Sequence, residues 1–168
     1  DADLFNCTIT DNIASNLYGN GAGAVRFATS GKKAVNCLIA NNRGYEGGTG
    51  GVTAGSGIAA ELVNCTVVGN WTAGGGVAGV NGVSLVNSIV WNNKNANGKI
   101  TDSIPAANNS CAEKLTDTEV YPDCISEDPK FANNGFSDYE LDRDSPCVDT
   151  ALTQQWMRES AFEGAERQ

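Results

Sequence analysis

The sequence contains no histidine among its 168 residues. This absence removes the commonest general base, the usual zinc ligand, and the Ser-His and Cys-His pairs of nucleophilic enzymes. Aromatic residues make up 7% of the chain, and no apolar run approaches the roughly 20 residues that a membrane helix needs. Neither end resembles a signal peptide, so we expect any targeting segment to lie outside this sequence or to have been removed.

Positive charge is also scarce. The chain has 11 Lys and Arg against 20 Asp and Glu, a formal net charge of -9. Residues 1–110 hold six acids, six bases and 18 of the 20 Gly, whereas residues 111–168 hold 14 acids and five bases. We therefore divide the chain into a neutral, Gly-rich part, 1–110, and an acidic part, 111–168. Nucleic acid needs a basic face, so we expect no nucleic-acid partner.

A short motif recurs four times without gaps. It reads FNCTI at 5–9, VNCLI at 35–39, VNCTV at 63–67 and VNSIV at 86–90. The copies are 30, 28 and 23 residues apart, and a looser fifth copy falls at 109–110. In each copy a second Asn follows the first by six residues, namely Asn12, Asn42, Asn70 and Asn93. Repeats of this size with variable insertions are typical of a solenoid, in which each repeat forms one coil.

Apolar and polar residues alternate inside each copy, which indicates one β-strand per copy. We expect the uncharged face to point inward and to carry three stacks: Phe5, Val35, Val63 and Val86; Cys7, Cys37, Cys65 and Ser88; and Ile9, Ile39, Val67 and Val90. Parallel strands about 4.8 Å apart would place each of these residues on its equivalent in the next copy. The first Asn of each copy would then face outward.

The second Asn of each copy is predicted to lie at the turn that leaves the strand. Asn tolerates left-handed backbone there and can bond to backbone groups of the next coil, so we expect a structural Asn ladder. Asn amides that bind a sugar are the alternative. Gly clusters at 19–23, 47–51 and 74–76 predict tight turns into a second short strand. They lack the context of a phosphate loop.

These observations predict an all-β fold, a parallel β-helix (solenoid) of about four to five coils with an irregular C-terminal cap. The repeat period fits one full coil of a three-sheet helix. A sandwich of hairpins is the alternative, but hairpin dipeptides are sparse and the period exceeds the roughly 8–12 residues expected for sandwich strands.

The coil motif resembles the right-handed parallel β-helix repeats of bacterial surface proteins, including relatives of the chlamydial polymorphic outer-membrane proteins. The tail carries DPKF at 128–131, DYEL at 138–141 and SPCVD at 145–149. These segments resemble the choice-of-anchor Q cap, whose usual wording is D-P-x-F, D-Y-x-L and S-P-x-x-D. The segment EGAER at 163–167 resembles the D-G-x-x-R segment of that cap, with Glu163 in place of the usual Asp.

The resemblance implies an extracellular or bacterial cell-surface location, associated with the outer membrane. We expect a non-catalytic secreted or surface module that acts as an adhesin, a scaffold or an accessory component of an outer-membrane assembly. We also expect this chain to be a fragment, with further coils or a protein partner covering its N-terminal edge, since a bare coil exposes unpaired backbone groups. The alternatives are the C-terminal part of a polysaccharide lyase or glycoside hydrolase, and a glycan-binding module.

Six cysteines in a presumed secreted protein raise the question of disulfides. Cys7, Cys37 and Cys65 share one repeat position, and three stacked thiols cannot all pair among themselves. We favour a ladder of free, buried thiols there. Cys111 and Cys124 flank a polar stretch and are the best disulfide candidates, and we expect Cys147 to be buried in the cap.

The sequence offers few candidates for a site. Trp71, Trp91, Tyr18 and Tyr45 could form an aromatic platform for a polysaccharide, although covering a corner of the core is the simpler role. Arg43, Tyr45 and Glu46 form the one group of mixed catalytic types. A surface turn carries charge in any case, so we predict no catalytic residues.

We expect no cofactor and no metal site. Calcium is the one candidate ion, because the tail carries several aspartates: Asp138, Asp142, Asp144 and Asp149. They lack the D-x-D-x-D-G order of an EF-hand loop. No Cys-x-x-Cys or Cys/His set is present for zinc.

Overall fold

The computed structural model describes residues 2–15, 21–132 and 139–151, which form short strands and no helix. Four sheets are present. Sheet I has the order β1 (Leu4–Phe5), β4 (Lys32–Val35), β8 (Ala60–Val63), β12 (Ser84–Val86) and β15 (Ala107–Asn108). Sheet II contains β2 (Thr8–Thr10), β5 (Leu38–Ala40), β9 (Thr66–Val68), β13 (Ile89–Trp91) and β16 (Cys111–Ala112). Sheet III contains β6 (Arg43–Gly44), β10 (Trp71–Thr72) and β14 (Lys94–Asn95). Sheet IV contains β3 (Val25–Phe27), β7 (Val52–Ala54) and β11 (Val80–Asn81).

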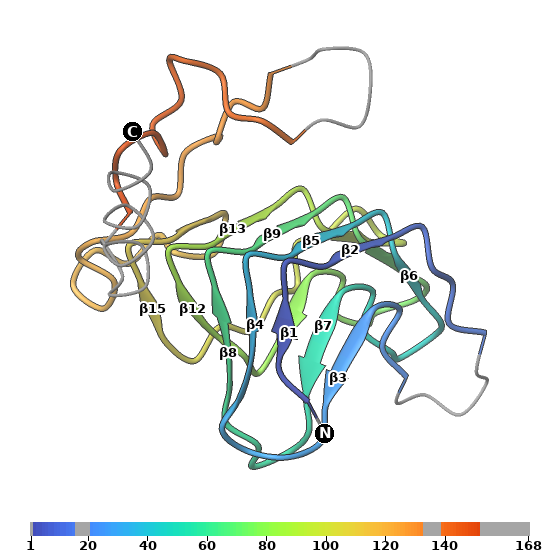
Figure 1. Ribbon diagram of the computed structural model, residues 1–168. Coiled ribbons are helices and arrows are strands. Elements are labelled where there is room, and N and C mark those ends of the chain that lie inside the picture. The colour runs from blue at the N-terminus through green and yellow to red at the C-terminus, as the bar shows by residue number, and fades with distance from the viewer. Residues whose placement is uncertain (1, 16–20, 133–138, 152–168) are drawn as a thin grey trace, which may run out of the picture.

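Every pairing between these named strands is parallel, and each strand pairs with its equivalent in the next repeat (Figure 1). In sheet II, for example, Ile39 lies between Ile9 and Val67, and Val67 pairs in turn with Val90. Along the chain the strands of one repeat fall in sheets IV, I, II and III before the next repeat begins. The prediction of an all-β fold with parallel strands is confirmed. The repeat supplies strands to four sheets, where the sequence predicted three.

The predicted single strand of each motif is in fact two strands in different sheets. The first Asn of each copy has a left-handed backbone, with φ between 45° and 53° at Asn6, Asn36, Asn64, Asn87 and Asn109. Asn adopts this conformation more readily than most residues, and it bends the chain from sheet I into sheet II. The prediction that these residues lie in mid-strand is therefore wrong, although Asn6 and Asn36 do face solvent.

This bend also reverses which residues of sheet I point inward. Ala34, Leu62 and Leu85 are fully buried in the core. The neighbouring stack, which was predicted to be internal, lines a groove on the outer face of sheet I together with Lys33 and Glu61. Its members are Phe5, Val35, Val63 and Val86. Phe5 is 55% exposed. Strict alternation through the Asn would place both Phe5 and Cys7 inside, but the left-handed turn breaks the alternation.

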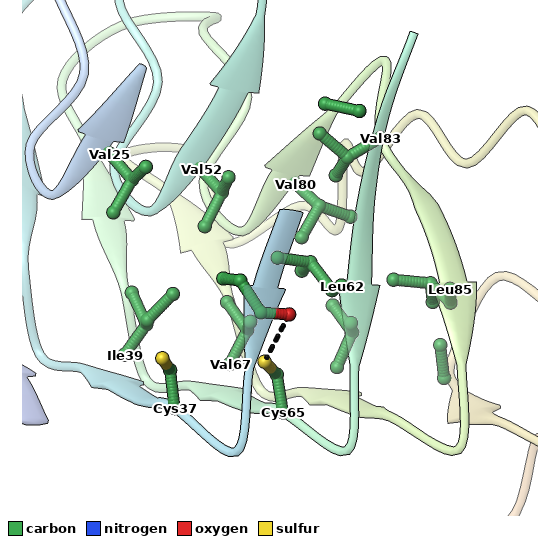
Figure 2. Close-up of a cluster of buried hydrophobic side chains, with 14 of the residues drawn as sticks. Val25, Cys37, Ile39, Val52, Leu62, Cys65, Val67, Val80, Val83 and Leu85 are labelled. Carbon is green, nitrogen blue, oxygen red and sulfur yellow. Dashed lines mark hydrogen bonds between the residues drawn. The ribbon is translucent and has the colours of Figure 1, made fainter. Parts of the chain in front are cut away.

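The core is formed by aliphatic side chains of sheets I, II and IV, which meet in one cluster (Figure 2). Beside Ile39 and Val67 lie the thiols of Cys37 and Cys65, which are 2% and 1% exposed. Cys65 Sγ donates to the Ala34 carbonyl at 3.3 Å, the dashed line in Figure 2. By register the stack runs through Cys7, Cys37, Cys65, Ser88, Ser110 and Cys124. Each repeat thus has a small side chain at this position, directly after the left-handed Asn, where the chain bends tightly from sheet I into sheet II.

A row of buried asparagines crosses the repeats where the chain leaves sheet II. Asn42 Nδ2 donates to Asn70 Oδ1 at 3.0 Å, and Asn70 Nδ2 donates to Asn93 Oδ1 at 3.0 Å. The backbone N–H groups of Asn42 and Asn70 donate to the same oxygens at 2.9 Å. Asn12 begins the row, with its Nδ2 donating to Asn42 Oδ1 at 2.9 Å.

The left-handed backbone predicted for these asparagines lies one residue earlier. It occurs at Asp11, Asn41, Gly69 and Asn92, with φ between 53° and 63°. Asn42, Asn70 and Asn93 are at most 1% exposed, so their amides face inward while the preceding residue makes the turn. A buried amide needs partners for both its donor and its acceptor, and each layer supplies them to the next.

The acidic part begins by covering the end of the core. Sheet II continues past residue 110 through β16 and a parallel bridge between Cys111 and Ile125. Leu115 is 2% exposed in the core cluster, and Tyr121 packs against that cluster while its hydroxyl donates to the Ile104 carbonyl at 3.1 Å. Residues 113–124 therefore close off apolar side chains that the last repeat would otherwise expose.

The segment 139–151 then returns along the outer side of sheet II (Figure 1). Its two anchors are far apart in sequence. Asn41 Nδ2 donates to the Tyr139 hydroxyl at 3.0 Å, and Asn109 Nδ2 donates to the Thr150 carbonyl at 3.1 Å. Tyr139 also packs edge-on against Phe131, with ring centroids 5.6 Å apart. The tail thus lies along the side of the repeats and not only over their end.

Strand alternation places Cys111 and Cys124, the predicted disulfide pair, on opposite faces of sheet II. Cys124 stacks on Ser110 in the inward row, because Ile125 pairs with Cys111. Cys111 is the next residue along the strand and faces outward, where it lines a pocket with Cys147. The sheet therefore separates the two side chains.

A buried carboxylate ends sheet IV. In an earlier repeat the Gly51 carbonyl accepts hydrogen bonds from Ala24 N and Val25 N. At the last repeat the Oδ1 of Asp102 takes this role and accepts from Gly79 N and Val80 N, both at 2.9 Å. Asp102 is 8% exposed, and burial raises its pKa from 3.8 to about 6 although these two hydrogen bonds favour the ionised form. Nearby Glu113 raises this pKa further and Lys114 lowers it.

Replacing Asp102 with asparagine is expected to remove a pH dependence of stability. The native state holds the Asp102 proton at pH values where the unfolded chain has lost it, so this contribution to stability is complete below about pH 4. It is lost as pH rises through about 6. Between pH 5 and pH 7.5, urea unfolding should show the wild type losing about 1–1.5 kcal/mol relative to Asp102→Asn. Asp102→Ala is the companion variant, expected to be about 2–3 kcal/mol less stable than Asp102→Asn at every pH because two buried N–H groups lose their acceptor. Equal pH profiles for the wild type and Asp102→Asn would contradict the assignment.

Candidate functional site

A groove lined by side chains of several chemical types lies along sheet III. Its volume is about 920 Å³, and its walls are formed by Asp11, Ile13, Asn41, Arg43, Gly69 and Trp71. An acid, a base, an amide, an aliphatic group and an indole thus share one concave surface. A few convergent polar groups beside an apolar wall are typical of binding sites for small molecules and sugars.

Strand register builds the first wall of this groove. Ile13 bridges to Arg43, Arg43 pairs with Trp71, and Trp71 pairs with Lys94. The next residue in β10, Thr72, is fully buried, so Trp71 faces outward by alternation. The outer column of sheet III therefore contains Ile13, Arg43, Trp71 and Lys94. The strands that carry neighbouring members of the column are about 4.8 Å apart.

The left-handed corner between sheets II and III builds the second wall. Asp11 and Asn41 occupy this corner in successive repeats, directly before Asn12 and Asn42 of the row. Gly69 is the third corner residue, and a Cβ there would lie 2.8 Å from Asn41 Oδ1. The absence of a side chain at Gly69 lets the Asn41 amide sit close against the corner. Nδ2 of Asn41 is already held by the Tyr139 hydroxyl, so this wall is fixed from outside as well.

Trp71 is the prominent apolar group, with 38% of its surface exposed. The Arg43 guanidinium lies 6.0 Å from the ring centroid, at the outer limit of a cation–π contact. Lys94 follows Trp71 on the other side, so two cations flank the indole. Lys94 also lowers the pKa of Glu113, although burial raises that pKa overall. The indole is thus an exposed apolar surface between positive charges.

The predicted aromatic residues do not all meet. Trp71 lines the groove, while Trp91 ends β13 and lies beside Val68 in sheet II, across the corner. Tyr45 follows β6, and its carbonyl oxygen accepts a hydrogen bond from Thr72 Oγ1 at 3.2 Å. Tyr18 lies outside the described residues. Of Arg43, Tyr45 and Glu46, the structure brings Arg43 into the groove.

Sequence reasoning missed four residues of the groove: Asp11, Ile13, Asn41 and Gly69. A signal for them was present, because Asp11 and Asn41 each precede a repeated Asn and so share one place in the repeat. Turn residues at equivalent positions lie side by side once the repeats stack. The same reasoning places Ile13 in the column of Arg43 and Trp71.

Within the part of the chain that the structure describes, no three Cys, Asp or Glu side chains are grouped so as to hold a metal ion. Of the aspartates considered for calcium, Asp142 Oδ1 accepts from Asp144 N at 3.3 Å, and Asp149 has a left-handed backbone with φ of 59°. Asp138 lies outside the described residues, as does the EGAER segment. The described residues also contain no helix long and apolar enough to span a membrane.

Searches of family models, of curated proteins and of solved structures found no match to this chain. The geometry of the groove and of the stacked strands therefore carries the functional argument.

Proposed function

We propose that this chain forms a right-handed parallel β-helix of the bacterial cell surface, which acts as a non-catalytic adhesin-type module and binds polysaccharide in the groove beside Trp71. The parallel pairing of equivalent strands over successive repeats supports the β-helix. Segment 139–151 returns along sheet II, and the tail carries motifs that resemble those of the choice-of-anchor Q cap.

The exposed indole between polar side chains is the observation that carries the binding role. Sugar rings present C–H faces that pack on an aromatic ring, while their hydroxyls need hydrogen-bond partners at the edge. Trp71 supplies the ring, and the side chains of Asp11 and Arg43 line the same groove. These walls sit on sheet III and a constrained corner, so little ordering would be needed on binding.

The charge around Trp71 favours an acidic polysaccharide. Arg43 and Lys94 occupy the neighbouring places in the outer column of sheet III, and each could pair with a uronate carboxylate. Asp11 is the one carboxylate among the described residues that form the groove. Glycoside hydrolysis ordinarily uses two carboxylates, so this groove supports binding better than cleavage.

Affinity electrophoresis in gels that contain polygalacturonate, alginate or a neutral β-glucan tests the proposal. The wild type should be retarded by the uronate polymers, and Trp71→Ala should bind about tenfold more weakly, since a stacking contact contributes roughly 1.4 kcal/mol. Trp91→Ala, the matched control on sheet II, should behave as the wild type.

The same polymers should remain intact during incubation with the protein. Unsaturated products, followed by ultraviolet absorbance, or new reducing ends would overturn the non-catalytic role. Equal retardation of the wild type and Trp71→Ala would overturn the groove.

A further inference from the structure

Two cysteines meet between the last strand of sheet II and the returning tail. Cys111 begins β16 and is 2% exposed, and Cys147 is partly buried in the segment that lies against it. Both line one pocket of about 390 Å³, together with Asn109, Leu141 and Thr150. The Cys111 thiol donates to the Glu127 carbonyl at 3.3 Å, and each of the two cysteines shifts the pKa of the other, as expected for neighbouring side chains.

Hydrogen bonds fix the backbone on both sides of this thiol pair. On the sheet, Cys111 N donates to the Ser88 carbonyl at 2.9 Å. In the tail, Cys147 N donates to Ser145 Oγ and the Cys147 carbonyl accepts from Thr150 Oγ1, both at 3.1 Å. The bond from Asn109 Nδ2 to the Thr150 carbonyl then ties the tail to the corner just before β16. The backbone hydrogen bonds of the sheet and of the tail therefore hold both cysteines in place.

The two thiols are also chemically unequal. The hydrogen bond with Cys111 lowers the pKa of Cys147, and the same contact, together with burial, raises the pKa of Cys111. By contrast, burial raises the pKa of Cys65 to about 12, and it also raises that of Cys37. The thiolate is the reactive form of cysteine, so Cys147 is the favoured nucleophile among these residues.

We propose that Cys111 and Cys147 form a disulfide that fastens residues 139–151 to the outer side of sheet II. The oxidant is a disulfide, either of a small molecule or of a protein thiol oxidase, as found in oxidising compartments. The Cys147 thiolate attacks one sulfur of the oxidant and releases the other as a thiolate. The Cys111 thiol then gives up its proton, and its sulfur attacks Cys147 Sγ and displaces the remaining half of the oxidant as a thiolate. In sum the protein loses two protons and two electrons, and the oxidant takes them up to become two thiols.

Each other cysteine is placed less well for this reaction. Cys7, Cys37 and Cys65 lie in the inward stack. Cys124 belongs to the same stack, on the opposite face of the sheet from Cys111. The proposed bond does not depend on the glycan groove, so either proposal can fail without the other.

Peptide mapping of the wild-type protein tests the bond directly. The protein is incubated in a buffer of reduced and oxidised glutathione, quenched with acid, alkylated in denaturant and digested with trypsin. Cleavage after Lys99, Lys114, Lys130, Arg143 and Arg158 places Cys111, Cys124 and Cys147 in three separate peptides, 100–114, 115–130 and 144–158. The expected result is a linked pair of 100–114 and 144–158, with four of the six cysteines alkylated.

Two variants complete the test. Cys147→Ser should abolish the linked pair and leave all five remaining thiols open to alkylation, whereas Cys124→Ser should leave the pair intact. Limited proteolysis of the folded protein should release the tail from Cys147→Ser faster than from the oxidised wild type. A link between 100–114 and 115–130, a link within the inward stack, or six alkylated cysteines in the wild type would each overturn the proposal. The wild-type map decides the question even if a variant fails to fold.

Discussion

Replacing Asn70 with alanine is expected to lower the free energy of unfolding by about 3–5 kcal/mol. Asn70 is 1% exposed and sits in the middle of the buried asparagine row. Its Nδ2 donates to the Ile39 carbonyl at 2.9 Å and to Asn93 Oδ1 at 3.0 Å, and its Oδ1 accepts from Asn42 N and Asn42 Nδ2. Its Nδ2 also lies 3.3 Å from the Val68 carbonyl, and alanine leaves all these partners without this side chain in a place that water does not reach.

Urea unfolding followed by circular dichroism measures this loss. Asn12→Ala is the matched control, because Asn12 makes the same kind of bond to Asn42 but is exposed. Water can replace the lost partner at Asn12, so we expect a cost below about 1 kcal/mol. Similar losses of unfolding free energy at both positions would show that burial is not the reason for the contribution of Asn70 to stability.

Replacing Gly50 with alanine is expected to cost about 3 kcal/mol, for a steric reason. A Cβ at Gly50 would lie 2.5 Å from the carbonyl oxygens of both Ala78 and Trp71. These are backbone atoms of the next repeat, and Gly50 N itself donates to the Val77 carbonyl at 2.9 Å. Neither group can rotate away as a side chain would, so adjacent repeats would have to separate locally.

Gly75→Ala is the control for this substitution. A Cβ at Gly75 would meet nothing within 4 Å, and the residue needs no left-handed backbone. We expect its melting temperature to match the wild type, whereas Gly50→Ala should melt well below it. A Gly50→Ala variant as stable as Gly75→Ala would mean that the repeats do not approach each other as closely as the structure has them.

The parallel stacking of the repeats could be predicted from the sequence because the motif keeps its internal spacing while the insertions vary. Cys7, Cys37 and Cys65 mark one position three times, and the structure pairs the strands around them in that register. The corners were harder to predict. Asn36 and Asn64 fit a strand by alternation, and their left-handed backbone depends on a turn that alternation does not reveal.

The tail and the groove depend on contacts between residues far apart in the sequence. Asn41 and Tyr139 are 98 residues apart, and no local pattern links them. The aromatic and charged members of the groove, Trp71 and Arg43, stand out by residue type alone. Asp11 and Asn41 read as ordinary turn residues until the repeats are stacked.

The most direct test of the stacking is a nuclear Overhauser spectrum of the isotope-labelled protein, read across sheet II. The structure predicts contacts between amide and Hα protons of adjacent strands in the order Ile9, Ile39, Val67, Val90, with all strands running the same way. Strong Hα–Hα contacts between these strands would indicate antiparallel pairing and contradict the account. So would a Val67 strand that neighbours neither Ile39 nor Val90.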